Sequence, residues 1–298
     1  MSRRRVYLSV AFFLVFVVGV WFLFIREFDV RFKFKARTLP DIALVTFKTW
    51  ASSQGTDDVS YDFETISAIQ TIKSGTEKYT INWSFDLQKD STTIAYAAIT
   101  SDGNRFKNRL GSLFSSTPIK KEGAALVNDF YNKLNEHLAK VRVKVVGKSA
   151  FDEQLCICLP VETTQLGKAG GMMKNYSYIG EIISKDELKI NGNPLLEIEE
   201  WDQKEDFLKF NFCFPVEEKK DLSDSSFFYK SFEQVDALQA VYNGNYINSD
   251  RAWYALKFHA ERNDIQVEMQ PLEIFYHNPN IDREEMKWRA DVFLPLSK

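Results

Sequence analysis

The residues of this chain that could carry chemistry are few and widely spaced. Cys156 and Cys158 alternate on one predicted strand, and Cys213 lies on another. Thiols at this spacing, without histidine or further cysteine beside them, make a poor tetrahedral metal site. We therefore expect no metal and no cofactor, and we interpret the three cysteines as buried structural thiols.

Acid–base chemistry has one candidate pair. His277 follows Glu273 by a few residues, and a carboxylate beside an imidazole could move a proton. No Ser-His-Asp arrangement is visible in the sequence, and Gly167, Gly170 and Gly171 do not follow the spacing of a phosphate-binding loop. Binding is therefore the first expectation, and catalysis is the alternative.

The elements that must position these residues form an internal repeat. Each copy reads as a strand, a glycine-containing turn, a helix, a strand that begins Pro-Leu and a closing strand with a proline near its end. Two β-α-β-β units should pair their sheets and leave an apolar groove at a pseudo-two-fold axis, where ligand sites often form. The predicted elements are strands at 154–162, 194–198, 210–216, 234–241, 271–274 and 290–296, a helix carrying Met173, Tyr176, Ile179 and Ile183, and a helix capped by Ser249.

Three segments of the second copy resemble a known family. Tyr242-Asn243-Gly244-Asn245-Tyr246, followed by Ala252-Trp253, resembles the Gly-x-Tyr…Ala-Trp signature of the GyrI-like domain, the bacterial transcription-activator effector-binding domain. Residues 273–279 (EIFYHNP) are similar to its Glu-x-Tyr-x-x-Asn-Pro segment, and residues 288–296 resemble its closing strand. The resemblance covers residues 150–298.

The resemblance implies a ligand site. The family binds amphipathic small molecules, often cationic or aromatic, in a cleft lined by a buried glutamate and aromatic side chains, and some members hydrolyse their ligands. By position, Glu273 would be that glutamate, and Trp253, Tyr246 and Tyr276 would be the aromatic walls. A carboxylate among aromatic rings is costly to bury unless it meets a cation or its pKa rises.

Each of these assignments has an alternative. Glu273 could face solvent or pair with a lysine or arginine, as most glutamates do, and Trp253 and Tyr246 could be ordinary core residues. Phe275 stands where the family usually has tyrosine, and Ala290-Asp291 replaces its usual Thr-Glu. These departures weaken the expectation of chemistry more than that of binding.

The middle of the chain predicts a separate α+β domain. Period-two patterns predict strands at 29–36, 79–87 and 92–100, and a helix begins at Pro40. A long amphipathic helix is expected at 122–140, with a stripe of Val127, Phe130, Tyr131, Leu134 and Leu138. This order resembles the START/SRPBCC helix-grip fold, in which a curved antiparallel sheet grips a helix around an apolar cavity. An unrelated α+β packing is the alternative.

The N-terminus predicts a membrane anchor. Residues 6–25 hold no charged residue and would span about 30 Å as a helix, which is the thickness of the hydrocarbon core of a bilayer. A cleaved signal peptide is the alternative, but this apolar run is longer than is typical and does not end in small residues. Arg3, Arg4 and Arg5 favour a cytoplasmic tail with the remaining chain outside, whereas the basic residues after the span, Arg26, Arg31, Lys33, Lys35 and Arg37, favour the reverse.

Composition narrows the classes of function. The chain has 298 residues, of which 45% are hydrophobic and 27% charged, so it is globular rather than disordered. A net charge of −3 argues against nucleic acid as a partner. Three cysteines argue against a disulfide-stapled scaffold.

We therefore predict an α+β, single-pass membrane protein in three parts. Residues 1–26 are the cytoplasmic tail and transmembrane helix, 27–147 an SRPBCC-like domain, and 150–298 a duplicated β-α-β-β GyrI-like domain. The expected function is binding of a small amphipathic or hydrophobic molecule, cations included. The alternatives are a hydrolase of a reactive small molecule with Glu273 as general base, and a structural envelope protein whose cleft is filled.

Overall fold

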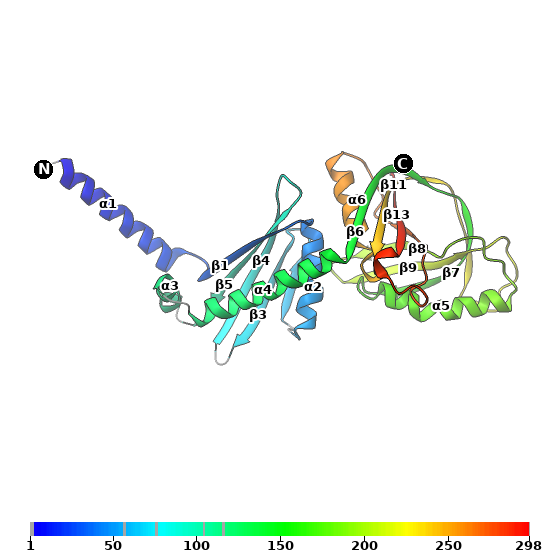
Figure 1. The fold of residues 1–298 in the computed structure, drawn as a ribbon, viewed down its shortest axis with the longest axis horizontal. Coiled ribbons are helices and arrows are strands. Elements are labelled where there is room, and N and C mark those ends of the chain that lie inside the picture. Colours follow the sequence, from blue (N-terminus) through cyan, green and yellow to red (C-terminus); the bar gives the residue numbers. More distant parts are fainter. Residues whose placement is uncertain (1–2, 56–57, 75–76, 104, 115–116, 298) are drawn as a thin grey trace. The chain divides into compact units, whose positions relative to one another are not determined.

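The computed structural model describes residues 3–55, 58–74, 77–103, 105–114 and 117–297. It is a mixed α+β structure with two antiparallel sheets, and it divides into two compact units, residues 1–135 and 136–298 (Figure 1). The α+β class expected from the sequence is therefore confirmed.

The chain begins with an apolar helix. α1 (Arg3–Val20) continues directly into η1 (Trp21–Ile25), a short π-helical segment. The stretch Tyr7–Ile25 has 19 residues and a mean hydropathy of 2.8, and none of it is buried in the protein. By length and composition, this helix suits either a membrane span or a signal sequence.

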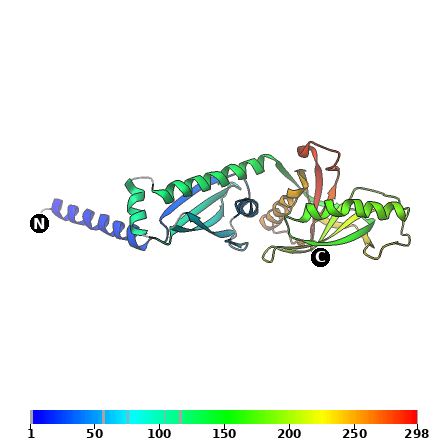
Figure 2. The same ribbon diagram turned by 90° about the horizontal axis from the view of Figure 1, so that it is seen from below.

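A five-stranded sheet in the order β1-β5-β4-β3-β2 forms the centre of the first unit. Its strands are β1 (Val30–Ala36), β2 (Val59–Asp62), β3 (Ser67–Ser74), β4 (Glu77–Leu87) and β5 (Thr93–Ser101). Three helices accompany them: α2 (Pro40–Ser53), α3 (Arg105–Phe114) and the long α4 (Pro118–Ala139), which lies along the sheet in Figure 2. The strands and helices predicted here from periodicity are confirmed to within a few residues, whereas β2, β3 and α3 were not predicted.

Aromatic rings fill the space between this sheet and helices α2 and α4. Phe47, Trp50, Trp83 and Phe130 are each at most 2% exposed, and the centroid of Phe130 lies 5.2 Å from Phe47 and 5.5 Å from Trp83. On α4, Val127, Phe130 and Leu134 are buried as the predicted stripe requires, but Tyr131 is exposed. The core of this unit is therefore a packed aromatic cluster.

The second unit contains an eight-stranded sheet in the order β10-β7-β9-β8-β12-β13-β11-β6. The chain passes twice through strand, helix, strand, strand, first as β7-α5-β8-β9 and then as β11-α6-β12-β13. The corresponding strands lie in mirrored order about the β8–β12 pair. The elements are β6 (Val141–Phe151), β7 (Gln154–Thr163), α5 (Lys168–Lys185), β8 (Leu195–Asp202), β9 (Phe207–Pro215), β10 (Phe228–Phe232), β11 (Val235–Gly244), η2 (Tyr246–Asn248), α6 (Arg251–Arg262), β12 (Leu272–Phe275), η3 (Glu285–Lys287) and β13 (Arg289–Pro295).

The two faces of this sheet differ in what they bury. Both α5 and α6 pack on one face, where Ile179 and Trp253 join one core with Phe212 and Val292. The other face carries a smaller cluster that includes Phe151. The ring of Phe151 on edge strand β6 lies 5.8 Å from that of Phe232 on the opposite edge strand β10, so the sheet curls until its edges approach.

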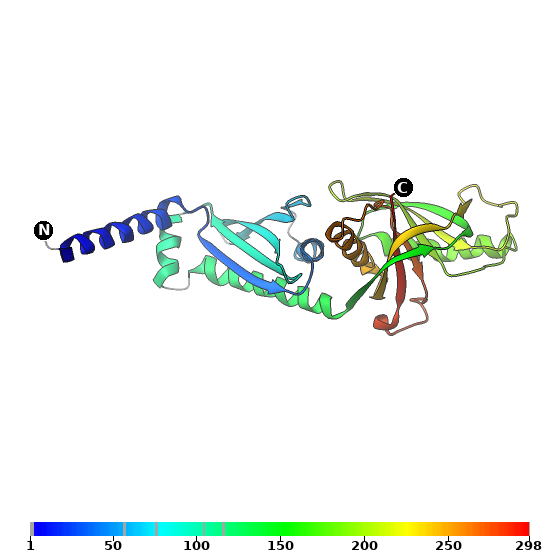
Figure 3. The ribbon, with the colours of Figure 1, turned by 90° about the horizontal axis from the view of Figure 1, so that it is seen from above.

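Strand β6 was not predicted, and it crosses the boundary at residue 147 that we expected from the sequence. It pairs along its whole length with β11 in the second unit, as seen from above in Figure 3.

Ser249 was expected to cap a helix, and this expectation was wrong. Helix α6 starts at Arg251 with Asp250 at the N-cap position, and no side chain caps it. The hydroxyl of Ser249 instead hydrogen-bonds to the carbonyl of Tyr246 and to the carboxylate of Glu273. The hydroxyl of Ser249 therefore serves the contact with Glu273 on β12 and does not cap α6.

The interpretation of the cysteines as free thiols was right only for buried Cys156. Cys158 and Cys213 form a disulfide. Strands β7 and β9 are antiparallel, and their register places these two residues directly opposite each other with Cα atoms 4.1 Å apart. Strand register across 55 residues of sequence separation could not be read from cysteine spacing.

Candidate functional site

An apolar pocket of about 280 Å³ lies on the helical face of the second unit. Helix α5 of the first copy supplies one wall. The other wall comes from the second copy, from η2, from the end of β12 with the segment after it, and from Trp288 just before β13. The pocket therefore lies where the two β-α-β-β copies meet. Its main apolar lining residues are Met172, Met173, Tyr176, Phe212, Tyr246, Phe275 and Trp288.

The aromatic wall of this pocket is held rigidly. The ring of Tyr246 lies 4.7 Å from Phe275 and 5.5 Å from Trp288. Its hydroxyl donates to the carbonyl of Arg289 at 2.8 Å and accepts from the amide of His277 at 3.1 Å. Burial raises the pKa of Tyr246 to about 12, so the phenol stays neutral at physiological pH.

The opposite wall adapts more easily. Met172 and Met173 line it with flexible thioether side chains, which fit ligands of irregular shape. Gly170 also lines the pocket, and a Cβ atom at this position would meet no atom within 4 Å. The missing side chain leaves space that a larger residue would occupy.

A buried charge cluster lies beside the pocket. The ammonium of Lys168 donates to Oε1 of Glu273 and to Oγ of Ser249, both at 2.6 Å, and Ser249 donates to Oε2 of Glu273 at 2.6 Å. All three side chains are fully buried, and the ammonium lies 4.7 Å from the centre of the Trp253 ring. Pairing with a lysine or arginine was the alternative to the ligand role expected for Glu273, and the structure shows such a pair, with Lys168.

The sequence neighbours of Lys168 and Glu273 place this charge cluster beside the pocket. Lys168 precedes Ala169, which lines the pocket, and Glu273 is on the same face of β12 as Phe275. Glu273 and Trp253 do not themselves line the pocket. Because both carboxylate oxygens of Glu273 accept hydrogen bonds inside the protein, its charge is compensated before any ligand arrives.

Trp253 packs as a core residue. It is fully buried, its ring lies 5.1 Å from that of Trp201, and its indole N–H has no hydrogen-bond partner among the residues that the structure describes.

Tyr276 lies on the opposite face of the sheet. It lines a polar cavity of about 490 Å³ together with Gln239 and Asp291. Its hydroxyl donates to Asp291 at 3.1 Å, and Arg289 binds the same carboxylate through two contacts of 2.8 Å. Burial and Asp291 raise the pKa of Tyr276. Of the four predicted site residues, only Tyr246 lines the apolar pocket, and the assignment of the four to ligand binding stays a prediction.

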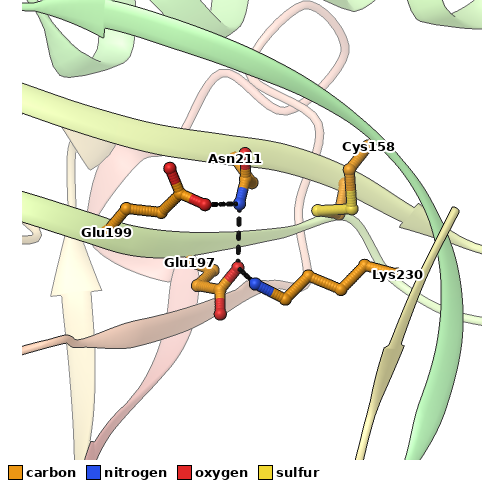
Figure 4. The surroundings of a disulfide bond; sticks show 6 residues. Cys158, Glu197, Glu199, Asn211 and Lys230 are labelled. Atoms are coloured by element: carbon orange, nitrogen blue, oxygen red, sulfur yellow. Dashed lines mark hydrogen bonds and ion pairs between the residues drawn. A yellow bond between two sulfur atoms is a disulfide. The ribbon is translucent and has the colours of Figure 1, made fainter. Parts of the chain in front are cut away.

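The disulfide belongs to the smaller cluster of the sheet, which includes Phe293, and Phe293 also lines this polar cavity. Figure 4 shows the charged residues beside the disulfide. The amide of Asn211 donates to Glu197 at 2.9 Å and to Glu199 at 2.8 Å, and Lys230 pairs with Glu197. Burial, with Glu197 nearby, raises the pKa of Cys156 to about 12, which makes this thiol unreactive. Within the described ranges, no group of three His, Cys, Asp or Glu residues could hold a metal ion.

Sequence reasoning missed Lys168, Met172, Phe275 and Trp288. Lys168 is a charged residue at the start of a helix, where lysines are usually solvated, so nothing local marks it as buried. Phe275 and Trp288 lie inside the segments that carry the family resemblance, but their role depends on strand register.

Comparisons with known proteins give likenesses of fold only. No protein-family model matches the sequence, and no curated protein matches it. The C-terminal domain of EcmrR is similar over 53% of this chain and 98% of its own, with 14% identity and a TM-score of 0.46. SAV2435 bound to tetraphenylphosphonium is similar over 52% and 94%, with 9% identity and a TM-score of 0.38. A hydrolase from Listeria innocua is similar over 56% and 98%, with 13% identity and a TM-score of 0.34. At TM-scores below 0.5, these likenesses assign neither a site nor a function to this chain.

Proposed function

We propose that the second unit is a GyrI-like module that binds a small, predominantly apolar and uncharged molecule in the pocket between its two copies. The observation that carries the proposal is the pocket itself, a cavity of about 280 Å³ walled by Tyr246, Phe275 and Trp288 and by the methionines of α5. Ligand sites are typically concave and mainly apolar, with few polar groups, and this pocket has that character.

The charge of the ligand follows from Lys168. The strongest contact that a cationic ligand could make here, an ion pair with Glu273, is already taken by Lys168 and Ser249. Apart from the aromatic residues, the polar side chains of the lining come from Asn245 and His277, and none of the lining residues is Asp or Glu. We therefore narrow the expected amphipathic ligand to a neutral one with at most one or two polar atoms.

A matched pair of ligands tests this proposal. Naphthol and trimethyl(naphthyl)ammonium share one aromatic skeleton and differ in charge. We expect naphthol, or a neutral compound of its class, to raise the melting temperature of the full chain, because a ligand at 100 times its Kd stabilises the fold by about 2.7 kcal/mol. We expect no shift from the ammonium compound.

Two results would contradict the proposal. A larger shift with the ammonium compound would show that the site accepts cations after all. No shift with any member of a broad neutral aromatic panel would favour the structural alternative, in which the pocket has no ligand.

The hydrolase alternative has no observation in its favour. Glu273 is fully buried, both of its oxygens are hydrogen-bonded, and it does not line the pocket. A general base must reach the proton that it abstracts.

We also propose that the helix at residues 6–25 anchors the protein in a membrane, with both units on the extracytoplasmic side. The disulfide Cys158–Cys213 supports this side, since disulfides persist in oxidising compartments and are rare in the cytosol. For the first unit we propose a reduced helix-grip relative whose filled aromatic core serves packing instead of ligand binding.

A further inference from the structure

Helix α3 presents an apolar surface for which ligand binding gives no reason. We propose that α3 is a second membrane contact, lying in the interface of the bilayer that the N-terminal helix spans, with Phe106 and Leu110 against lipid. This role rests on the membrane anchoring proposed above and adds a lipid-binding surface to it.

Two apolar side chains of α3, those of Phe106 and Leu110, are exposed and share one face. Phe106 is 45% exposed and Leu110 is 39% exposed, and residues four apart in a helix lie one above the other. The ring of Phe106 lies 5.8 Å from that of Phe24, which is itself 67% exposed and belongs to the last turn of the apolar stretch Tyr7–Ile25. The apolar surface of the candidate span therefore continues onto α3.

A buried arginine holds α3 in this place. Arg109 is 1% exposed, and its Nε donates to Asp29 at 2.9 Å. Its two other nitrogens donate to the carbonyls of Leu23, at 2.9 Å, and of Arg26. These carbonyls belong to the end of the apolar helix, where backbone oxygens lack intrahelical partners. Arg109 therefore ties α3 directly to the point at which the span ends.

The first unit is tied to the same point. Asp29 uses its second oxygen to accept a hydrogen bond at 3.0 Å from the backbone amide of Ser101, the last residue of β5. One buried ion pair thus joins the span, α3 and the central sheet, and α3 cannot leave the end of the span without breaking it.

Lipid is the occupant that fits this surface. Phe24 lies at the end of a span of bilayer length, so whatever covers Phe24 and the adjoining Phe106 must be compatible with the membrane boundary. Trp21 and Arg26 flank the same end, and Arg26 stacks on Phe22 at 4.3 Å, as is typical of interfacial anchors. Interfacial helices bury their apolar face about 5–10 Å into the headgroup boundary.

Fluorescence quenching in vesicles tests this contact. We would prepare the full chain with a single added cysteine, in three variants: Leu110→Cys on α3, Phe16→Cys in the middle of the span, and Leu87→Cys. Leu87 is 45% exposed, close to the 39% of Leu110, but it lies at the far end of β4 from Asp29. The native cysteines stay unlabelled, since Cys156 is buried and the other two are in the disulfide. Each variant carries a nitrobenzoxadiazole label in phosphatidylcholine–phosphatidylglycerol vesicles that contain lipids with a nitroxide near the headgroup or deep in the acyl chain.

We expect the Leu110→Cys label to emit at shorter wavelength than the Leu87→Cys label and to be quenched most by the shallow nitroxide. The Phe16→Cys label should be quenched most by the deep nitroxide, and the Leu87→Cys label by neither. An unquenched label at position 110 with a quenched label at position 16 would overturn the interfacial role and leave the anchor standing. An unquenched label at position 16 would overturn both.

Discussion

At the scale of single residues, Lys168 decides the character of the site. Its ammonium lies between the carboxylate of Glu273 and the face of Trp253, so the charge of Glu273 is compensated inside the protein. The pocket beside it is left without free charge. A charge that is buried and paired is also a point of vulnerability, since loss of one partner leaves the other uncompensated.

Replacement of Lys168 should show this coupling. Lys168→Met leaves Glu273 buried without its cation, so the free energy of unfolding should fall by about 3–5 kcal/mol at neutral pH. The double variant Lys168→Met/Glu273→Gln removes both charges and should recover much of that loss. Denaturant unfolding of both variants measures the difference. An equal loss of unfolding free energy in the single and double variants would show that the loss does not come from an uncompensated charge on Glu273.

His137 should make stability depend on pH. It lies near the end of α4, and Arg251 donates to its Nε2 at 3.2 Å. Burial, followed by the charge of Arg251, lowers the pKa of His137 from 6.5 to about 4, although Asp250 opposes the shift. The unfolded chain therefore binds a proton below pH 6.5 that the folded chain binds only near pH 4. Stability should fall over this window as pH falls, by up to about 3 kcal/mol.

The measurement is the free energy of unfolding between pH 7 and pH 4 for the natural chain and for His137→Asn. The variant should lose part of the pH dependence, and His259→Asn, which removes an imidazole from the end of α6, is the matched control. An unchanged slope in His137→Asn would contradict the assignment.

At the scale of elements, α5 and the aromatic strand ends are the two walls of the pocket, so the spacing between them governs binding. Gly170 and Gly180 both lie on α5, and a Cβ atom at either meets no atom within 4 Å, but only Gly170 lines the pocket. The same substitution can therefore be made at Gly170, inside the pocket, and at Gly180, outside it.

Gly170→Phe should block binding of a neutral aromatic ligand without unfolding the protein. The helix gains about 0.5 kcal/mol of intrinsic stability when glycine is replaced by phenylalanine, while the new ring occupies the pocket. Gly180→Phe should bind as the natural chain does. The affinities of the two variants can be compared by titrating each with ligand and following tryptophan fluorescence, because Trp288 lines the pocket. Equal affinity in both variants would place the ligand elsewhere.

The disulfide acts between two neighbouring strands, β7 and β9, of the first copy. It joins residues that are 55 positions apart in the sequence. A disulfide that closes a loop of this size typically adds about 2–4 kcal/mol to the free energy of unfolding. Replacement of Cys158 and Cys213 together by alanine should lower the free energy of unfolding by this amount, measured under non-reducing conditions. A loss below about 1 kcal/mol would show that sheet pairing alone holds the two strands.

At the scale of the whole molecule, the disulfide supports the proposed extracytoplasmic position of the second unit. Ile281 is 75% exposed in the second unit. An Ile281→Cys variant in intact cells should therefore react with a membrane-impermeant maleimide. Labelling that requires permeabilised cells would place this unit on the cytoplasmic side and contradict the proposed topology.

The sequence by itself determined the elements whose periodicity is strong. Residues 79–87 and 92–100 were predicted as strands and are β4 and β5, and the helix beginning at Pro40 is α2. Strand β3 was not predicted because a polar residue, Gln70, occupies one of its core positions. There it accepts a hydrogen bond from Trp83 at 3.1 Å. Apolar alternation reports only positions that apolar side chains fill.

Only the tertiary structure decided what meets in space. That Lys168 meets Glu273, that Cys158 faces Cys213, and that Tyr276 meets Asp291 all depend on register and on the order of strands in the sheet. Local periodicity fixes which side of its own element a residue occupies. Long-range pairing fixes its neighbours, because a shift of one residue in a strand exchanges the two faces.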